Sequence, residues 1–470
     1  MAQSGYSGGT RRVSGRSSGR SASAGRRSYT ASKTRDTAPS ARKAASAPSE
    51  RDTVLSSRRT AVRRRPVSAP QRRTVNSPTS IRKTRKNSEK PLNKPAAKKR
   101  TLKDRLVRAG DMDYTLLFIV ILIVSLGLIV MLSASAPAGS RMQGDSYYYF
   151  QRQLIFILIG FAGMIIVSRI NLDSFLELIP KAFIICIVLL VLVLIPGIGV
   201  ESHGARRWLN IPFIQLQPSE LMKPVIAMYI AYLIKKGVLN LKQLKSNFVC
   251  LGIITVVAAL LMLETHLSGT IVIVGIAVCV MIAGGMPIKP LLIGGAILIA
   301  LVIVYLQFDS VRMARVDSLI DPFADSQGNG YQISQSIYAI GSGRIFGLGL
   351  GQSVQKYSNL PEPYNDFIFS IVCEELGFFG AVVVILLFAA LFLKAMKIAI
   401  NAPDVWSSLT CIGISSQLGI QTFLNMGVAV SIIPNTGVSL PFFSYGGTSI
   451  LTLLLEMGVL LNISRKSVKD

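Results

Sequence analysis

The stretch YTLLFIVILIVSLGLIVMLSASAPAGS, residues 114–140, contains no charged residue. A helix that crosses the hydrocarbon core of a bilayer needs about 20 predominantly apolar residues. Further runs of this kind follow at 153–168, 182–200, 246–263, 267–288, 290–308, 376–393 and twice within 405–455, and a weaker one, with Glu220 and Lys223 at its start, spans 218–234. Only helices and closed barrels satisfy the backbone in lipid. The sequence therefore predicts an all-α fold, a polytopic membrane helix bundle with about ten transmembrane helices.

The residues before these runs have a different composition. Residues 1–110 hold 30 of the 51 Lys and Arg residues but only 5 of the 24 Asp and Glu residues. Large apolar side chains are scarce there, so this part cannot bury enough surface to offset the entropy lost on ordering. We predict a disordered basic cytoplasmic tail at 1–110 and a transmembrane domain at 111–470. The basic residues are not interleaved with an aromatic platform of the kind that binds single strands, so nucleic acid is not expected as a partner, whereas anionic membrane lipid is.

The distribution of charge predicts the orientation of the spans. With the tail in the cytoplasm, ten spans return the C-terminus to the cytoplasm, and the Lys-rich turn at 235–245 falls on that side, as the positive-inside rule expects. The long polar segment 309–365, between spans seven and eight, and the loop 201–217 then lie outside. Segment 309–365 shows no evident regular structure, and loops this long are commonly functional. Basic residues in these loops, Arg207 and Lys356 among them, indicate either an anionic ligand or contact with lipid phosphates.

Two sets of ionisable residues lie within predicted spans. Glu220 and Lys223 are three residues apart, so they share a helix face and can pair. Ionisable residues at membrane depth mark functional sites by default, although a structural salt bridge explains this pair equally well. Asp366, Ser370 and Glu374 have the spacing of one helical face at the start of span eight. Asp366 also suits a helix N-terminus, whereas Glu374 lies too deep for that explanation.

The segment LIDPFADSQGNGYQISQS, residues 319–336, interrupts the apolar pattern with Asp321, Asp325 and several glycines. A carboxylate beside basic groups can remove a proton while the cations bind an anionic leaving group. Turn formation is the simpler explanation for an isolated aspartate. With two histidines and no ligand spacing among the cysteines, a zinc site is not expected. The residues alone thus predict an outward-facing membrane protein that handles an anionic, lipidic ligand.

Five motifs, in order along the chain, resemble those of the SEDS family (shape, elongation, division and sporulation), which includes FtsW, RodA and SpoVE. The resemblance covers about residues 110–465 and is closer to the FtsW/SpoVE branch. It implies a peptidoglycan glycosyltransferase that polymerises lipid II on the outer face of the bacterial cytoplasmic membrane at the division septum. Expected partners are a class B penicillin-binding protein and other cell-division proteins. The motifs are GARRW (204–208), QPSELMK (217–223), DSQGNGYQISQS (325–336), GLGLGQSVQKYSNLPEPYNDFIFSIVCEELG (347–377) and PNTGVSLPFFSYGGTS (434–449).

The resemblance also implies roles for residues. Asp325 matches the loop aspartate of a D-x-x-G-x-G-Y-Q setting and is expected to be the catalytic base, which takes a proton from the C4 hydroxyl of the acceptor sugar. That hydroxyl then attacks C1 of the donor with inversion, and undecaprenyl diphosphate leaves toward the basic residues. Arg207, Trp208, Glu220 and Lys223 match residues of the family's motifs and are expected to bind substrate. Substrate binding is also expected of Gln332, Lys356, Asp366 and Glu374, which lie in or beside the polar segments on the outer side.

The chain departs from the family pattern at one turn. Where relatives carry a sequence such as E-P-D-L-G-T, residues 264–270 read ETHLSGT, and His266 replaces the usual acid. No metal ligand is assigned, and a divalent cation such as Mg²⁺ stays open as a cofactor. A lipid II flippase and a non-catalytic scaffold for a class B penicillin-binding protein remain as alternative functions. The sequence also leaves open a role in sporulation or elongation, and the role of Glu456.

Overall fold

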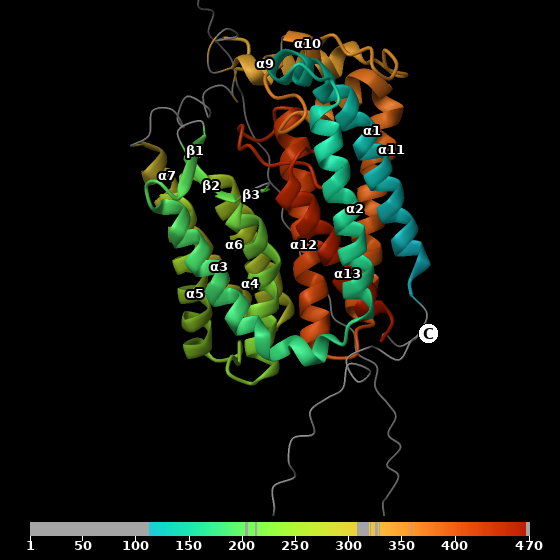
Figure 1. The fold of residues 1–470 in the computed structure, drawn as a ribbon. Helices are drawn as coiled ribbons and strands as arrows, with labels where there is room; N and C mark the ends of the chain where they lie inside the picture. The colour runs from blue at the N-terminus through green and yellow to red at the C-terminus, as the bar shows by residue number, and fades with distance from the viewer. Residues whose placement is uncertain are drawn as a thin grey trace, which may run out of the picture. The chain divides into compact units, whose positions relative to one another are not determined.

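The computed structural model describes residues 112–202, 205–211, 214–307, 319, 321–324, 328, 330–358 and 360–466. Every described residue belongs to one compact unit of the chain. The predicted tail and its boundary at residue 110 lie outside the described residues. The described part of the chain contains ten long helices, and the predicted bundle is confirmed (Figure 1). They are α1 (Tyr114–Gln143), α2 (Tyr148–Arg169), α3 (Ile179–Leu194), α4 (Pro218–Lys235), α5 (Leu244–Leu263), α6 (Leu267–Ala283), α7 (Ile288–Gln307), α11 (Ile368–Ile400), α12 (Val405–Ala429) and α13 (Gly447–Ser464).

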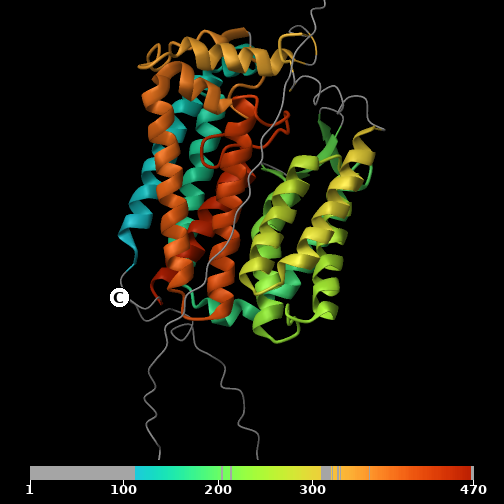
Figure 2. The ribbon, with the colours of Figure 1, turned by 180° about the vertical axis from the view of Figure 1, so that it is seen from behind.

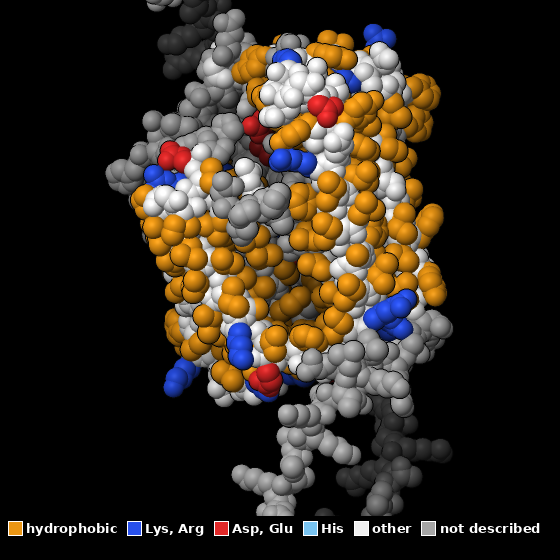
Figure 3. All heavy atoms as spheres, viewed as in Figure 1, with side chains coloured by type: hydrophobic (Ala, Val, Ile, Leu, Met, Phe, Trp, Pro, Cys, Tyr) orange, Lys and Arg blue, Asp and Glu red, His pale blue; other side chains and the backbone are white. Residues whose placement is uncertain are grey.

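Six helical segments in the described part are long and apolar enough, by length and composition, to cross a membrane. They are α1, α2, the segment Leu172–Leu194 that ends in α3, α5, α11 and α13. Figure 3 shows hydrophobic side chains over the middle of one face, with Lys and Arg side chains near both ends. This is the distribution expected of a protein whose apolar belt faces lipid.

The helices enclose two main hydrophobic cores, and α12 contributes to both. One core is formed by α1, α2, α11, α12 and α13, where Ile414 and Leu418 of α12 are buried. The other is formed by α3, α4, α5, α6 and α12, where Leu409 and Leu424 are buried. One helix therefore has opposite faces in different cores.

Glycines allow α2 and α13 to pack closely. A Cβ atom on Gly160 of α2 would come within 2.5 Å of Leu454 on α13. A Cβ atom on Gly458 of α13 would come within 2.7 Å of the Met164 carbonyl on α2. Small residues at such crossings let backbones approach and gain van der Waals contact, which stabilises helix pairs in lipid.

Connecting segments gather at one end of the bundle, here called the α9 end after α9 (Tyr331–Ser342). It comprises the turn 264–266, residues 430–446, and the described residues of 195–217 and of 319–367. The prediction that 309–365 lacks regular structure is wrong for α9 and for the short α10 (Gln355–Ser358). Figure 2 shows these two helices over the ends of the longer ones, and α9 packs on α11 while α10 packs on α1.

The loop predicted at 201–217 folds into a small antiparallel sheet of β1 (Gly199–Ser202), β2 (Ala205–Ile211) and β3 (Ile214–Leu216). The order of its strands follows the sequence, as in a meander. Its strands are too short and too irregular in pattern for the sequence to distinguish them from loop. The fold is therefore helical apart from this sheet in the residues described.

A glycine breaks α11 near the α9 end. Gly377 has φ of 69° within the helix, a left-handed conformation that side-chain-bearing residues rarely adopt. The break frees peptide groups that then pair with residues 344–349. Leu348 N donates to Glu374 O at 2.9 Å, and Phe378 N donates to Arg344 O at 2.9 Å. The start of α11 is thereby tied to the segment that leads into α10.

We expect Gly377→Ala to destabilise the protein by about 1–3 kcal/mol, because it forces a left-handed alanine. Its Cβ would also lie 2.3 Å from Gly347 N. Gly252→Ala in α5 is the matched control, because its Cβ would meet nothing within 4 Å and alanine favours helix. The measurement is thermal unfolding of both purified variants in the same detergent. Equal unfolding midpoints for the two variants would show that the break at Gly377 is not required.

Candidate functional site at the α9 end

The sheet places Arg207 of β2 beside the turn between α5 and α6, and the next residue, Trp208, pairs with Val200 of β1. Arg207 Nη2 donates to the carbonyl oxygen of Thr265 at 2.8 Å. Thr448 Oγ1 of α13 donates to Gln215 O of β3 at 2.7 Å, which fixes the sheet to the helix bundle. Arg207 is partly exposed, and a guanidinium has five N–H donors. Its position suits contact with an anion while the bond to Thr265 is kept.

Glu220 and Lys223 form the ion pair that their spacing predicts. Lys223 Nζ donates to Glu220 Oε1 at 2.6 Å, and the two side chains are only 3% and 7% exposed. Pro218 at the start of α4 suits the first helical turn, where its missing N–H costs nothing. The pair thus lies inside the protein, one to two turns below the sheet.

The turn between α5 and α6 buries two further titratable side chains, Glu264 and His266. Burial raises the pKa of Glu264 to about 8, and the nearby Arg207 guanidinium opposes this rise only in part. Burial, helped by the positive charges of Arg207 and Lys223, lowers the pKa of His266 to about 3. At neutral pH the imidazole is therefore neutral, and much of the Glu264 population is protonated.

We expect Glu264 to make the stability of the protein depend on pH. Between its ordinary pKa of 4.5 and about 8, the unfolded chain releases a proton that the folded protein keeps, so stability falls as pH rises. His266 acts oppositely, since its lowered pKa costs stability as pH falls below 6.5. Glu264→Gln should remove the loss of stability between pH 5 and 8, as measured by thermal unfolding in detergent, whereas Glu201→Gln, at an exposed carboxylate, should not. Parallel pH curves for wild type and Glu264→Gln would contradict this expectation.

Hydrogen bonds hold α9 in place from three sides. Gln332 Oε1 accepts from Asn435 Nδ2 at 2.6 Å, which ties α9 to the segment between α12 and α13. Ser336 Oγ lies 2.6 Å from Ser370 Oγ of α11 and donates to Ala429 O at 2.7 Å. Ser334 Oγ donates to Pro322 O at 2.6 Å, which ties residues 321–324 to α9.

Asp366 does not lie on the predicted helical face. The helix α11 begins at Ile368 with Phe367 as its N-cap, and Asp366 is in the turn before it. Its main-chain carbonyl accepts from Asn425 Nδ2 at 2.8 Å, and the same nitrogen donates to Val438 O at 2.7 Å. The spacing argument fails here because the aromatic residues of PYNDFIF pack as a turn against the core. Asp366 thus borders the segment 434–446.

Glu374 and Lys356, both expected to bind substrate, are buried and bonded within the protein. Glu374 accepts from Ser353 Oγ at 2.5 Å and from the backbone N–H groups of Val354 and Gln355 at 2.9 and 3.3 Å. Lys356 Nζ donates to Glu375 Oε1 at 2.8 Å, to Ser133 Oγ of α1 at 2.9 Å and to Gly351 O at 2.7 Å. Their role in substrate binding stays a prediction; their contacts are those of a structural anchor.

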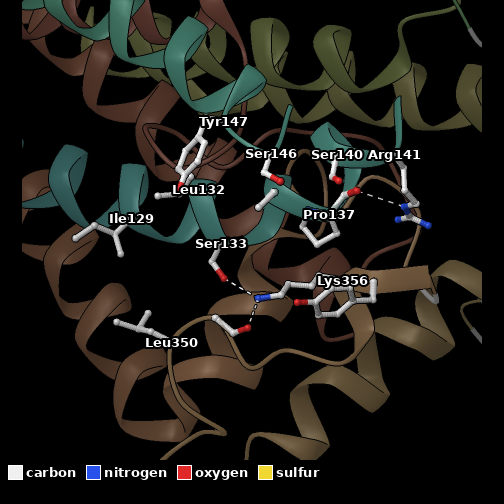
Figure 4. A pocket seen from close by; sticks show the side chains of 13 residues that line it. Ile129, Leu132, Ser133, Pro137, Ser140, Arg141, Ser146, Tyr147, Leu350 and Lys356 are labelled. Atoms are coloured by element: carbon white, nitrogen blue, oxygen red, sulfur yellow. Dashed lines mark hydrogen bonds between the residues drawn. The ribbon is translucent and has the colours of Figure 1, made fainter. Parts of the chain in front are cut away.

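The Lys356 anchor forms one wall of a pocket of about 790 Å³ beside the C-terminal turns of α1. Figure 4 shows Lys356 directed toward Ser133, with Ile129, Leu132 and Leu350 on the apolar side and Arg141 at the other. Of the residues predicted to bind substrate, only Lys356 lines it. The pocket therefore lies apart from the group formed by Arg207, Glu220 and Lys223.

Asp325, the predicted catalytic residue, lies outside the described residues, and its role stays a prediction. In the part of the chain that the structure describes, no three His, Cys, Asp or Glu side chains are grouped to hold a metal ion. The sequence did not single out Glu375, Asn425 or Asn435 as contributors to this end. Glu375 adjoins Glu374, and both asparagines are polar residues in or beside apolar runs, a signal that was available.

The helical bundle with an apolar belt, and the buried ion pairs at one end, define a multi-pass membrane protein with a polar site at the α9 end. The profile of the FtsW/RodA/SpoVE family, described as "Cell cycle protein", matches residues 114–469. The chain therefore belongs to this family.

Relatives of known name match over most of their length. "Stage V sporulation protein E" of Bacillus subtilis is 38% identical over 356 residues, which cover 76% of this chain and 97% of the relative. "Probable peptidoglycan glycosyltransferase FtsW" of Trichlorobacter lovleyi is 36% identical over 358 residues, which cover 76% and 94%. The corresponding FtsW of Nitrosomonas europaea is 38% identical over 362 residues, which cover 75% and 92%.

Solved structures resemble the fold as well. The rod shape determining protein RodA of Thermus thermophilus has a TM-score of 0.57 at 26% identity, covering 76% of this chain and 98% of RodA. A chain from the structure described as "Structural coordination of polymerization and crosslinking by a peptidoglycan synthase complex" has a TM-score of 0.62 at 26% identity, covering 76% and 99%.

Proposed function

We propose that this protein is a peptidoglycan glycosyltransferase that polymerises lipid II into glycan strands during cell division. The observation that carries the proposal is the match at 34–38% identity to relatives named as FtsW glycosyltransferases, over 90–98% of their length. The buried cation at Lys223 and the partly exposed Arg207 at the α9 end support it, since both suit a diphosphate leaving group.

The α9 end faces outward in this proposal, and both termini lie in the cytoplasm. Cationic side chains support this orientation, because the end opposite α9 carries Lys235, Lys236, Lys394, Arg465 and Lys466. An excess of Lys and Arg marks cytoplasmic loops. The protein would then work at the outer face of the cytoplasmic membrane, at the division septum.

The reaction that we propose needs one base and a cationic group. Asp325 takes the proton of the acceptor C4 hydroxyl, the oxygen attacks C1 of the donor sugar with inversion, and the C1–O bond to undecaprenyl diphosphate breaks. The charge that develops on the diphosphate is met by Arg207 and by the positive field of Lys223. A divalent cation such as Mg²⁺ would be held by the diphosphate oxygens and one or two carboxylates.

The partner that we propose is a class B penicillin-binding protein, a transpeptidase that crosslinks the new strand. The likeness to a chain of a peptidoglycan synthase complex that couples polymerization and crosslinking supports this proposal. Lipid II, membrane lipid and other division proteins complete the set of expected partners.

The test is a polymerisation assay in detergent with labelled lipid II, the full chain and a class B partner whose transpeptidase is blocked. Glycan ladders that need this chain would support the proposal, because detergent makes substrate accessible without transport. No ladders with any of several division-type partners, combined with transbilayer movement of lipid II in liposomes, would favour a flippase. Ladders that the partner makes without this chain would instead favour a scaffold.

A further inference from the structure

Three helices place polar side chains against one another in the interior of the bundle. Glu456 lies midway along α13 and is 2% exposed. Gln417 Nε2 of α12 donates to Glu456 Oε1 at 3.0 Å. Glu220 and Lys223 of α4 are close enough to act electrostatically on Glu456. Nothing in the proposed reaction uses Glu456.

The charges of this group do not balance. The elements α1, α2, α4, α11, α12 and β3 pack against α13, and on their described residues only Glu220 and Lys223 are titratable groups that act on Glu456. Two carboxylates thus face one ammonium in an apolar bundle. An uncompensated charge there is costly, so the group requires one further positive charge.

The hydrogen bonds show the same deficit. Glu456 Oε2 and Gln417 Oε1 have no partner in the described residues. One turn away on the same helix faces, Thr452 Oγ1 and Gln421 Oε1 are also buried without a partner. Oxygen acceptors therefore outnumber donors in this interface. A proton on Glu456 supplies both the missing charge and a donor, and buried water can satisfy the remaining atoms.

We propose that Glu456 binds a proton at neutral pH and that the protonated acid positions Lys223. While Glu456 is neutral, Glu220 is the sole counter-ion of Lys223 among the described residues. When the O–H bond of Glu456 breaks and its proton passes to water, the new carboxylate becomes a second counter-ion and draws the ammonium from Glu220. The functional part of this inference rests on the proposed function, in which Lys223 acts on the diphosphate. Glu456 is then a positioning residue.

The proton itself is tested without reference to activity. Infrared difference spectra of the purified full-length protein, wild type against Glu456→Gln, should contain the C=O stretch of a protonated carboxylic acid at neutral pH. Glu264→Gln, which removes another buried acid, should remove a different component. Gln417→Leu should shift the Glu456 component by removing its donor, and this variant serves if Glu456→Gln does not fold. Absence of the band would overturn the proposal. It would also be overturned if Na⁺, compared with choline, stabilised wild type but not Glu456→Gln, because the missing positive charge would then be a bound cation.

The positioning role is tested by the pH profile of polymerisation. Wild-type activity should fall about tenfold for each pH unit above the ionisation of Glu456. Glu456→Gln, the isostere of the protonated acid, should lack this alkaline limb, whereas Glu456→Leu should lose activity at every pH. Superimposable profiles for wild type and Glu456→Gln would overturn the positioning role. Failure of the proposed function is distinct, since it removes ladders altogether and leaves the infrared band.

Discussion

Asp325→Asn should lower the rate of glycan polymerisation by about 10²–10⁴-fold, the usual contribution of a general base. The amide keeps the size of the side chain but cannot take the proton of the acceptor hydroxyl. Binding of lipid II and of the partner should persist, because neither depends on that proton transfer. The measurement is the rate of ladder formation in detergent, together with co-purification of the partner.

Asp321→Asn is the matched control for Asp325→Asn. Asp321 Oδ1 accepts from the backbone N–H groups of Phe323 and Ala324 at 3.0 and 3.1 Å, a turn that asparagine forms equally well. Its variant should keep wild-type activity. If Asp325→Asn formed glycan ladders at the wild-type rate, Asp325 would not be the catalytic base. Asp366 and Glu374 would then be the next candidates.

Lys356→Met should destabilise the protein by about 3–5 kcal/mol, the usual cost of breaking a buried ion pair from one side. Lys356 and Glu375 are 3% and 1% exposed, and their charged atoms are 2.8 Å apart. The change leaves the Glu375 carboxylate buried without its cation and removes the link to Ser133 on α1. Adding Glu375→Gln should recover much of the lost stability, because this second change removes the unpaired carboxylate charge.

Lys236→Met provides the comparison for Lys356→Met. Lys236 pairs with Glu177 near the opposite end, where the side chains are 44% and 69% exposed. Breaking such an exposed pair costs about 0–1 kcal/mol. Thermal unfolding in one detergent compares the two variants. A stable Lys356→Met protein with a raised KM for lipid II would instead support substrate binding by Lys356.

The long helices were predictable because each apolar run satisfies one strong constraint, the thickness of the bilayer. The Glu220–Lys223 pair was predictable for a similar reason, since helical spacing alone puts the two residues on one face. The small sheet was not, because the short strands of 199–216 carry neither a long apolar run nor regular alternation. The sheet depends on contacts such as the hydrogen bond between Gln215 and Thr448. These two residues are more than 200 positions apart in the chain.

The polar residues of the α9 end show the limit of local reasoning. Substrate binding was predicted for Glu374 and Lys356 because they are charged residues in or near an expected outer loop. Their partners, Ser353 and Glu375, come into contact with them because the segment 344–356 packs on the start of α11. A sequence pattern identifies such residues as unusual, but long-range packing decides whether they contact a ligand or one another. The prediction that Asp366 shares a helical face with Ser370 and Glu374 was wrong for the same reason, since α11 begins two residues after Asp366.

The shared membership of α12 in both cores has a mechanical consequence. Helices α1, α2, α11 and α13 hold one face of it, and α3 to α6 hold another. If the two groups part to admit a lipid from the side, neither can leave α12 without exposing its own buried leucines. We expect the low-energy movement to be rotation of the two helix groups relative to each other, with α12 as the common axis. Separation of the groups as two blocks would cost more. Larger side chains on either buried face of α12 would then hinder this rotation, even though they lie away from the site.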